Sequence, residues 1–147
     1  MKITNYHSHT YRCKHAQGDA LDYVRIAFQG GASVYGISDH SPIPDGRYAD
    51  VRMALDELDS YEDAVRRAQA EFPEIEVLLG MECEYFPEFH AFYEDELLGR
   101  RDYDYLIGAG HYTPLEGSWH NSFANMDHPK MLNAYSRHLI EIMETGI

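Results

Sequence analysis

The regular alternation of short apolar segments with amphipathic segments of helical period constrains the fold of this chain most strongly. Four segments are predicted to be strands: Lys2–His7, Val34–Ser38, Ile75–Met81 and Tyr103–Ala109. Four predicted helices separate and follow them: Asp19–Gly30, roughly Met53–Phe72, Phe92–Leu98 and Lys130–Glu144. This βαβαβαβα order is typical of a parallel sheet with helices outside it, either open or closed into a barrel. We therefore expect an α/β fold in a single domain spanning residues 1–147.

Local signals support the individual elements. Asp19 is a plausible N-cap, and glycines at 30–31 and 146 mark helix ends. The central helix has Leu58, Tyr61, Val65 and Ala68 on one face, which we expect to be buried. The last helix has Leu132, Tyr135, Leu139 and Ile142 on one face, and its His138 is expected to be exposed. The segment Gly110–Pro129 is expected to be a loop.

Residues able to bind metals follow each predicted strand at its carboxyl end. In chain order they are His7 and His9, Asp39 and His40, Glu82 and Glu84, and His111, with His15 in the first loop. Because the carboxyl ends of parallel strands meet at one edge, we expect these side chains to converge. An isolated histidine is usually a surface or core residue without a ligand role. Histidines and carboxylates without a shared role, however, would be spread over both ends of the strands, and not gathered at the carboxyl ends. Imidazole and carboxylate together suit Zn, Mn or Fe.

Composition excludes several functional classes. The formal net charge is −13, with 25 acidic and 12 basic residues, which disfavours general binding to nucleic acid or anionic lipid. The sequence contains no apolar run near 18 residues and no leader-like start, so we expect no membrane partner and a cytoplasmic location. The two cysteines make no disulfide framework: Cys83 is expected to pack in apolar surroundings, and the role of Cys13 stays open.

Several spaced motifs resemble the PHP superfamily, named for polymerase and histidinol phosphatase domains. They are His7-x-His9-Thr10, His15, Ser38-Asp39-His40-Ser41-Pro42, Gly80-Met81-Glu82-Cys83-Glu84-Tyr85 and Gly110-His111. The segments 38–42 and 79–87, with Arg52-Met53 between them, are similar to the histidinol-phosphate phosphatase branch. The resemblance implies a distorted (β/α)7 PHP barrel, of which this chain would supply about the first four βα units. By the same resemblance it would lack the C-terminal part, and the open strand edges of such a half-barrel are expected to permit homo-oligomers.

The resemblance also implies a centre of two to three divalent metals. His7 and His9 would hold the first metal, Glu82 would bridge it to a second metal held by His111, and His15 and His40 would hold a third. Asp39, Glu84 and His120 would lie in a second shell or on the substrate side, with Asp39 fixing the orientation of an imidazole. His15 or His40 would be candidates to protonate the leaving group, and Glu82 would act in catalysis by holding two metals.

The implied function is that of a hydrolase, a metal-dependent phosphomonoesterase acting on a small phosphorylated substrate. Within the family branch this substrate is L-histidinol phosphate, an intermediate of histidine biosynthesis, and a metal-bridging hydroxide would attack it. Two alternatives stay open: another PHP phosphoesterase acting on phosphotyrosine, a nucleotide or a DNA end, and a catalytically incomplete metal-binding fragment. A nucleic-acid-binding module is poorly supported because the chain has no basic stripe.

Overall fold

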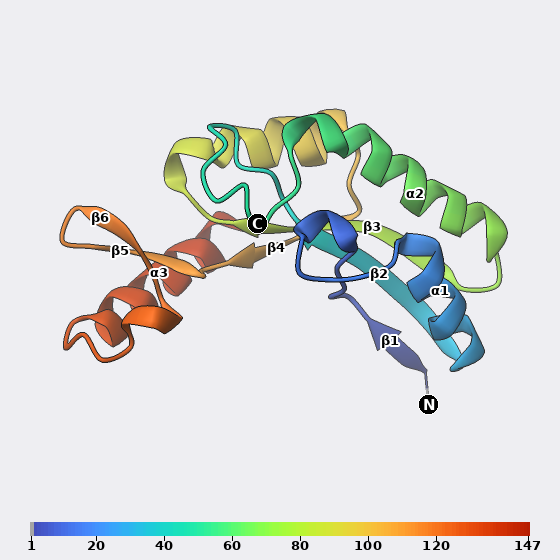
Figure 1. The fold of residues 1–147 in the computed structure, drawn as a ribbon, viewed down its shortest axis with the longest axis horizontal. Helices are drawn as coiled ribbons and strands as arrows, with labels where there is room; N and C mark the ends of the chain where they lie inside the picture. Colours follow the sequence, from blue (N-terminus) through green and yellow to red (C-terminus); the bar gives the residue numbers. More distant parts are fainter. Residues whose placement is uncertain (1) are drawn as a thin grey trace.

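The computed structural model describes residues 2–147, which form a curled parallel half-barrel with helices packed on it (Figure 1). The sheet has the order β1-β2-β3-β4. Its strands are β1 (Ile3–Asn5), β2 (Ala32–His40), β3 (Glu76–Glu84) and β4 (Tyr105–Ala109), and all neighbouring pairs are parallel. The predicted α/β class and the four predicted strands are therefore confirmed.

The helices are α1 (Ala20–Gln29), α2 (Leu58–Glu71), a π-helix (Phe92–Arg100) and α3 (Met131–Thr145). Short 3-10 turns cover Tyr11–Cys13, Leu55–Glu57, Pro87–Phe89 and Phe123–Asn125. Asp19 caps α1, where its side chain accepts a hydrogen bond from the N–H of Ala20, as predicted. The predicted buried face of α2 is also confirmed, and the hydroxyl of Tyr61 lies 2.9 Å and 2.7 Å from the carbonyls of Ile37 and Gly80. This contact ties α2 to both central strands.

The central strands extend further than predicted. The prediction ended β2 at Ser38 and β3 at Met81, whereas the strands run to His40 and Glu84. The reason is pairing: β2 and β3 stay in register to His40 opposite Glu82, and β4 continues the pairing to Glu84 opposite Ala109. Hydropathy cannot report hydrogen bonding between polar residues of neighbouring strands. The candidate ligands at these ends are thus held by the sheet itself.

The segment 110–129 is not a simple loop, which corrects the prediction. It contains an antiparallel hairpin of β5 (Tyr112–Leu115) and β6 (Ser118–Asn121). The turn residues Glu116 and Gly117 both have positive φ, of 52° and 84°, as a two-residue hairpin turn of type I′ requires. The usual signal for this turn is Asn-Gly or Asp-Gly, and Pro114 within β5 further weakens the strand pattern.

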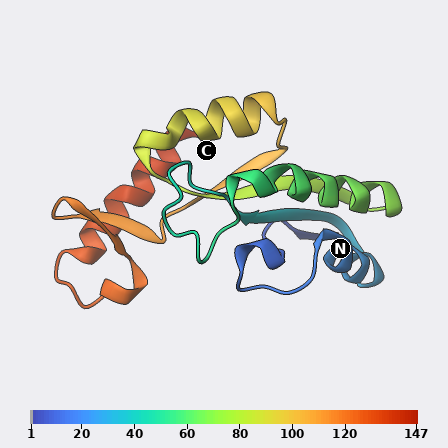
Figure 2. The ribbon, with the colours of Figure 1, turned by 45° about the horizontal axis from the view of Figure 1, so that its top comes forward.

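The hairpin and α3 form a lobe at one end of the sheet (Figure 1 and Figure 2). Its packing overturns two predictions. His138 is buried, with 1% exposed, because Trp119 and Tyr85 cover its ring at centroid distances of 5.4 Å and 6.1 Å. Leu132 is exposed instead, since α3 turns the face with Met131, Ala134, His138 and Ile142 toward the hairpin and sheet.

The Tyr105 ring, which is partly buried, lies across two glycines of the central strands. A Cβ atom added at Gly36 would lie 2.1 Å from the Tyr105 hydroxyl, and one added at Gly80 would lie 2.3 Å from its Cζ. The same hydroxyl donates to the carbonyl of Tyr6 at 2.6 Å, which fixes the segment that leads into His7. Among the described residues, no helix is both long and apolar enough to cross a membrane.

Candidate metal centre

The carboxyl ends of the four strands bring together the histidines and glutamates that the sequence analysis singled out. His7 and His9 follow β1, His40 ends β2, Glu82 lies near the end of β3, and His111 follows β4 by two residues. In the part of the chain that the structure describes, four groups of three residues have ligand atoms within 4.8 Å of one another. They are His7, His9 and Glu82; His40, Glu82 and His111; His9, His15 and His40; and His9, Cys13 and Asp39.

Glu82 lies at the centre of the cluster, and its two oxygens face different histidines. Its Oε2 is 3.1 Å from His7 Nε2, 3.3 Å from His9 Nε2 and 3.0 Å from His40 Nδ1. Its Oε1 is 3.6 Å from His111 Nε2. A carboxylate with one oxygen on each of two groups has the arrangement of a bridging ligand.

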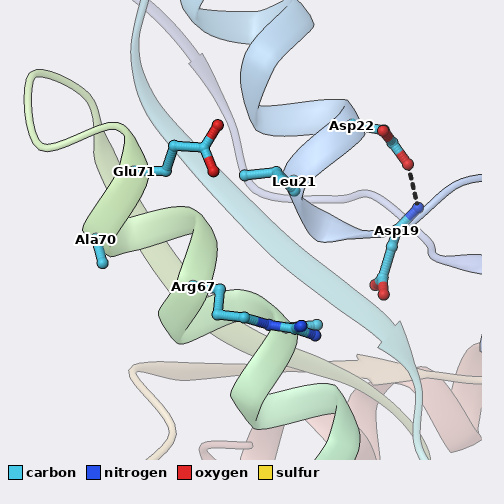
Figure 3. A pocket seen from close by; sticks show the side chains of 7 residues that line it. Asp19, Leu21, Asp22, Arg67, Ala70 and Glu71 are labelled. Carbon is cyan, nitrogen blue, oxygen red and sulfur yellow. Dashed lines mark hydrogen bonds between the residues drawn. The ribbon is translucent and has the colours of Figure 1, made fainter.

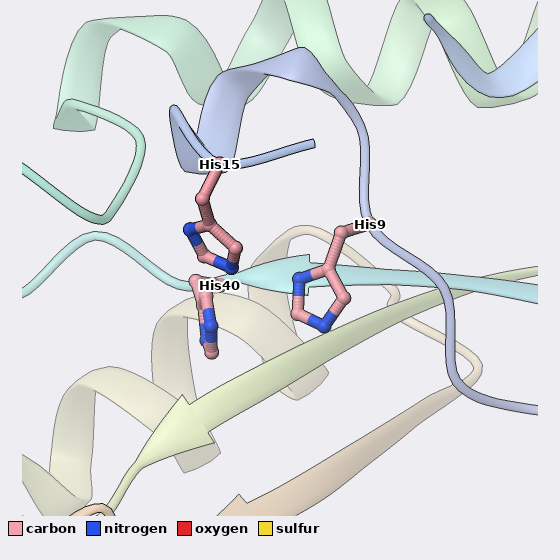
Figure 4. Close-up of side chains that lie close together, drawn as sticks. All are labelled: His9, His15 and His40. Atoms are coloured by element: carbon pink, nitrogen blue, oxygen red, sulfur yellow. The ribbon is translucent and has the colours of Figure 1, made fainter. Parts of the chain in front are cut away.

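His15 extends the cluster from the first loop, where it lies beside His9 and His40 (Figure 4). The ring centroids of His15 are 5.6 Å from His9 and 5.1 Å from His40. His15 Nδ1 is 2.8 Å from the carbonyl oxygen of Cys13. Because a carbonyl can only accept, Nδ1 carries the hydrogen and Nε2 keeps its free electron pair. In this tautomer His15 Nε2 can bind a metal ion but has no hydrogen to donate.

Asp39 holds the first loop against β2 and is fully buried. Its Oδ2 accepts hydrogen bonds from the backbone N–H of Thr10, at 3.0 Å, and from the Thr10 hydroxyl. Its Oδ1 accepts from the backbone N–H of His40 at 2.8 Å and lies 3.4 Å from His9 Nδ1. Cys13 is buried beside this group. Asp39 thus fixes the backbone at Thr10, next to His9, and at His40 itself.

Glu84 occupies the corresponding place on the other side of the cluster, and it is also fully buried. It accepts from His111 Nδ1 at 2.9 Å, from the backbone N–H of Tyr112 at 2.8 Å and from Arg52 Nη2 at 2.7 Å. Sequence reasoning used Arg52 only as part of a motif and missed this contact. No local pattern reports it, because 32 residues separate the two partners.

The electrostatic environment keeps Glu82 ionised. Burial alone would raise the pKa of Glu82, but the close contact with His40 at 3.0 Å, together with the charges of His40, His7 and His111, lowers that pKa to about 2. Burial lowers the pKa of His40, whereas the hydrogen bond to Glu84 raises the pKa of His111. Burial raises the pKa of Cys83 to about 12, and its side chain packs in the core as predicted.

The donor set fits divalent transition metals. Two ligand atoms on one tetrahedral zinc ion lie about 3.4 Å apart, since each is about 2.0–2.2 Å from the metal. The contacts of Glu82 with His7, His9 and His111, between 3.1 and 3.6 Å, match this spacing. In addition, Glu82 Oε2, His9 Nδ1 and His40 Nδ1 are buried, and although Glu82 Oε2 and His40 Nδ1 lie 3.0 Å apart, none of the three atoms has a well-directed hydrogen bond among the described residues. Such unpartnered polar atoms are costly unless another group binds them.

Other predicted residues lie elsewhere. His120 is on β6 opposite Thr113 and belongs to none of the four groups of ligand atoms found in residues 2–147. A pocket of about 510 Å³ lies between α1 and α2, where Leu21, Arg67 and Glu71 line it (Figure 3). It shares no residue with the histidine cluster. The cluster, and not this pocket, is therefore the candidate functional site.

Comparisons with known proteins find relatives of this chain. A probable histidinol-phosphatase of Deinococcus radiodurans is 35% identical over 130 residues, which cover 88% of this chain and 46% of that protein. A second one, from Schizosaccharomyces pombe, is 24% identical over 155 residues, covering 94% of this chain and 51% of the relative. The chain thus spans about half the length of the curated relatives it matches.

A solved structure from Listeria monocytogenes, provisionally named a histidinol phosphatase, shares the fold. Its TM-score is 0.65 at 17% sequence identity, over 82% of this chain and 49% of that structure. The family model described as PHP domain matches residues 5–146, nearly the full chain. The motifs, the strand-end cluster and this match lead to one conclusion: the chain belongs to the PHP domain family.

Proposed function

We propose that this chain is the metal-binding part of a phosphomonoesterase that hydrolyses L-histidinol phosphate to L-histidinol and phosphate, in histidine biosynthesis. The observation that supports this most is the position of Glu82, whose Oε2 faces His7 and His9 while its Oε1 faces His111. The names of the two relatives point to the same substrate.

The proposed ligands follow from the groups of side chains. His7, His9 and Glu82 would hold one divalent metal, and Glu82 with His111 would hold a second. His15 and His40 would hold a third. Bound divalent metals lower the pKa of water to near neutral and offset the charge of a phosphoryl group. Zn, Mn and Fe all suit these ligands.

The chain's own residues prepare this site. Glu82 stays ionised at neutral pH and presents both oxygens. His15 presents Nε2 because the Cys13 carbonyl takes the hydrogen bond of Nδ1. His40, with its side chain only 12% exposed and its pKa lowered by burial, is suited to act as a neutral ligand. Because a histidine bound to the metal cannot also supply the proton for the leaving alkoxide, we propose His15 and His40 as ligands of the third metal and assign that proton to neither of them.

A second candidate function is a metal-binding part that is inactive without further ligands. Each group of ligand atoms in the described residues contains three residues, and a catalytic zinc commonly keeps three protein ligands and an open position. Glu82, His9 and His40 are each shared between groups, however, so three ions together would have fewer protein ligands each. This sharing favours the second candidate for the chain by itself.

Metal analysis and phosphate release distinguish the two candidates. The chain is loaded with Mn²⁺ or Zn²⁺, its metal content is measured, and inorganic phosphate is followed with L-histidinol phosphate as substrate. Chelator-sensitive release that is lost in Glu82→Gln and kept in Glu88→Gln supports the phosphatase. Glu88 is a suitable control because it pairs with Arg47 at the surface, outside the cluster. Bound metal without turnover supports the inactive metal-binding part, and absence of bound metal contradicts both.

A further inference from the structure

Phe123 is an exposed aromatic residue beside the candidate metal centre, and the proposed chemistry gives it no role. It begins the 3-10 turn Phe123–Asn125 after β6, and 64% of its surface is exposed. Its ring centroid nevertheless lies 6.1 Å from that of His111, with 53° between the ring planes. Trp119 of the same hairpin differs, because its ring packs edge-on against Phe86 at 4.5 Å. Single exposed apolar side chains are common on protein surfaces, so the case for a role depends on how firmly Phe123 is held at this place.

The residue before Phe123 holds the chain there through buried hydrogen bonds. Ser122 is only 1% exposed, and its backbone N–H donates to the carbonyl of His111 at 2.8 Å. Its hydroxyl donates to the carbonyl of Gly110 at 2.9 Å and lies 2.9 Å from the hydroxyl of Thr113. The end of the β5–β6 hairpin is therefore fastened to the segment that carries His111. This fastening brings the Phe123 ring back to the metal centre and leaves it open to solvent.

This position suits contact with the organic part of a phosphate ester. Metals held by Glu82 and His111 would bind the phosphoryl group, so the organic part has to extend away from them. In L-histidinol phosphate a chain of three carbon atoms joins the ester oxygen to an imidazole ring, which is neutral or positively charged near neutral pH. A Phe face stacks on the neutral ring and attracts the charged ring by a cation–π interaction. A fixed and exposed Phe123 can accept both forms.

We propose that Phe123 is a specificity residue that touches the substrate and stacks on its imidazole ring while the metal centre holds the phosphate. This inference rests on the proposed function and deepens it, because it assigns recognition of the organic part of the substrate to a residue of this chain. Recognition of the imidazole ring and binding of phosphate are measured separately, so that failure of one is distinguishable from failure of the other.

The test uses two ligands that differ only in the imidazole ring. They are the phosphonate analogues of L-histidinol phosphate and of L-alaninol phosphate, in which a CH₂ group replaces the ester oxygen and prevents hydrolysis. Each is titrated into the Zn²⁺-loaded chain by calorimetry, and inorganic phosphate is a third ligand that reports the metal centre alone.

The variants separate the aromatic ring from its apolar character. Phe123→Leu removes the ring and keeps an apolar side chain, whereas Phe123→Tyr keeps the ring. Both variants should fold, because the side chain is largely exposed. Phe28→Leu is the matched control, since Phe28 is 40% exposed and lies on α1, outside the groups of candidate ligands in residues 2–147.

We expect the unsubstituted chain to bind the histidinol analogue about 2- to 10-fold more tightly than the alaninol analogue. Phe123→Leu should lose this preference by weakening the histidinol analogue alone, whereas Phe123→Tyr and Phe28→Leu should keep it. In proton spectra of the Zn²⁺-loaded chain, the imidazole protons of the bound analogue should shift upfield. That ring-current shift should decrease in Phe123→Leu, which a merely structural role of Phe123 would not cause.

Three results would overturn the inference. The first is a preference for the histidinol analogue that persists in Phe123→Leu, and the second is an equal loss of affinity for both analogues in that variant. The third is equal binding of the two analogues by the unsubstituted chain; if inorganic phosphate also binds, this result counts against ring recognition alone and not against the proposed function. If none of the three ligands binds the Zn²⁺-loaded chain, the phosphate site itself is absent, and the proposed function and this inference are both overturned.

Discussion

Replacing Asp39 by Asn tests how the site is built, because the substitution changes charge and hydrogen bonding but hardly any volume. Both oxygens of Asp39 accept backbone hydrogen bonds: Oδ2 from Thr10 and Oδ1 from His40. An Asn side chain has a single oxygen, so its NH₂ group must face an N–H on one side in either orientation. At least one buried donor then loses its acceptor, at a cost of about 1–3 kcal/mol.

The hydrogen bonds that remain lose their charged acceptor as well, which costs about 1 kcal/mol more. We therefore expect Asp39→Asn to lower the free energy of unfolding by about 2–4 kcal/mol. Asp104→Asn is the control, since Asp104 lies just before β4, beside the middle of β3, and among the described residues it accepts a side-chain hydrogen bond from the backbone N–H of Leu79 through one oxygen. Its amide oxygen can take over that bond, so the loss should stay below about 1 kcal/mol.

Urea unfolding of both variants, without added metal, measures these free energies. Mn²⁺ titration of the same samples should show affinity about 10- to 100-fold weaker in Asp39→Asn and unchanged in Asp104→Asn, because Asp39 also lies 3.4 Å from His9 Nδ1. If the two variants unfold within about 1 kcal/mol of each other, Asp39 does not hold the first loop through these hydrogen bonds.

Three further predictions concern pH, packing and assembly. The pKa of Glu82 is lowered from 4.5 to about 2, so the ionised carboxylate stabilises the metal-free fold above pH 4.5. This contribution, at most about 3 kcal/mol, is lost as the pH falls from 4.5 to 2. When the free energy of unfolding in urea is plotted against pH, Glu82→Gln should flatten the curve between these values, and an unchanged slope contradicts the assignment. Gly80→Ala should lower the free energy of unfolding by about 1–3 kcal/mol because the Tyr105 ring must move. Gly30→Ala is the control and should change this free energy little, since a Cβ added at Gly30 lies 3.4 Å from its nearest neighbouring atom. Equal effects of the two substitutions would show that the Tyr105 ring is not confined. The outer edges of β1 and β4 have no strand neighbour in the described sheet, so we propose self-association through them: sedimentation equilibrium should give a mass that rises with concentration, and a constant 17.0 kDa would exclude it.

The sequence was sufficient to predict the alternation of parallel strands with helices and the place of the candidate site for one physical reason. In a parallel sheet the position of a residue along its strand fixes the end at which it lies, so polar residues after apolar segments meet at one edge. His40 and Glu82 show this directly, because the sheet register places them opposite each other. The predicted helix cap at Asp19 and the buried position of Cys83 follow from similarly local rules.

What the sequence did not predict depends on contacts between distant segments. His138 is buried because a hairpin that no standard turn signal indicates covers its face of α3. The length of β2 and β3 depends on pairing with neighbours, and not on their own hydropathy. The contact of Arg52 with Glu84 joins an irregular segment to a strand, where neither periodicity nor parity applies.

The candidate ligands are of two kinds, those on strands and those on segments outside the strands. The sheet places His40, Glu82 and Glu84 by register, whereas His7, His9, His15 and His111 lie on segments outside the strands and depend on side-chain anchors. The anchors are the fully buried carboxylates of Asp39 and Glu84, one on each side of Glu82. Because an anchor acts through hydrogen bonds that an isosteric amide cannot reproduce, substitutions there should disturb the ligands while leaving the sheet register intact. The positions of His9 and His111 therefore depend more on Asp39 and Glu84 than on the regular elements.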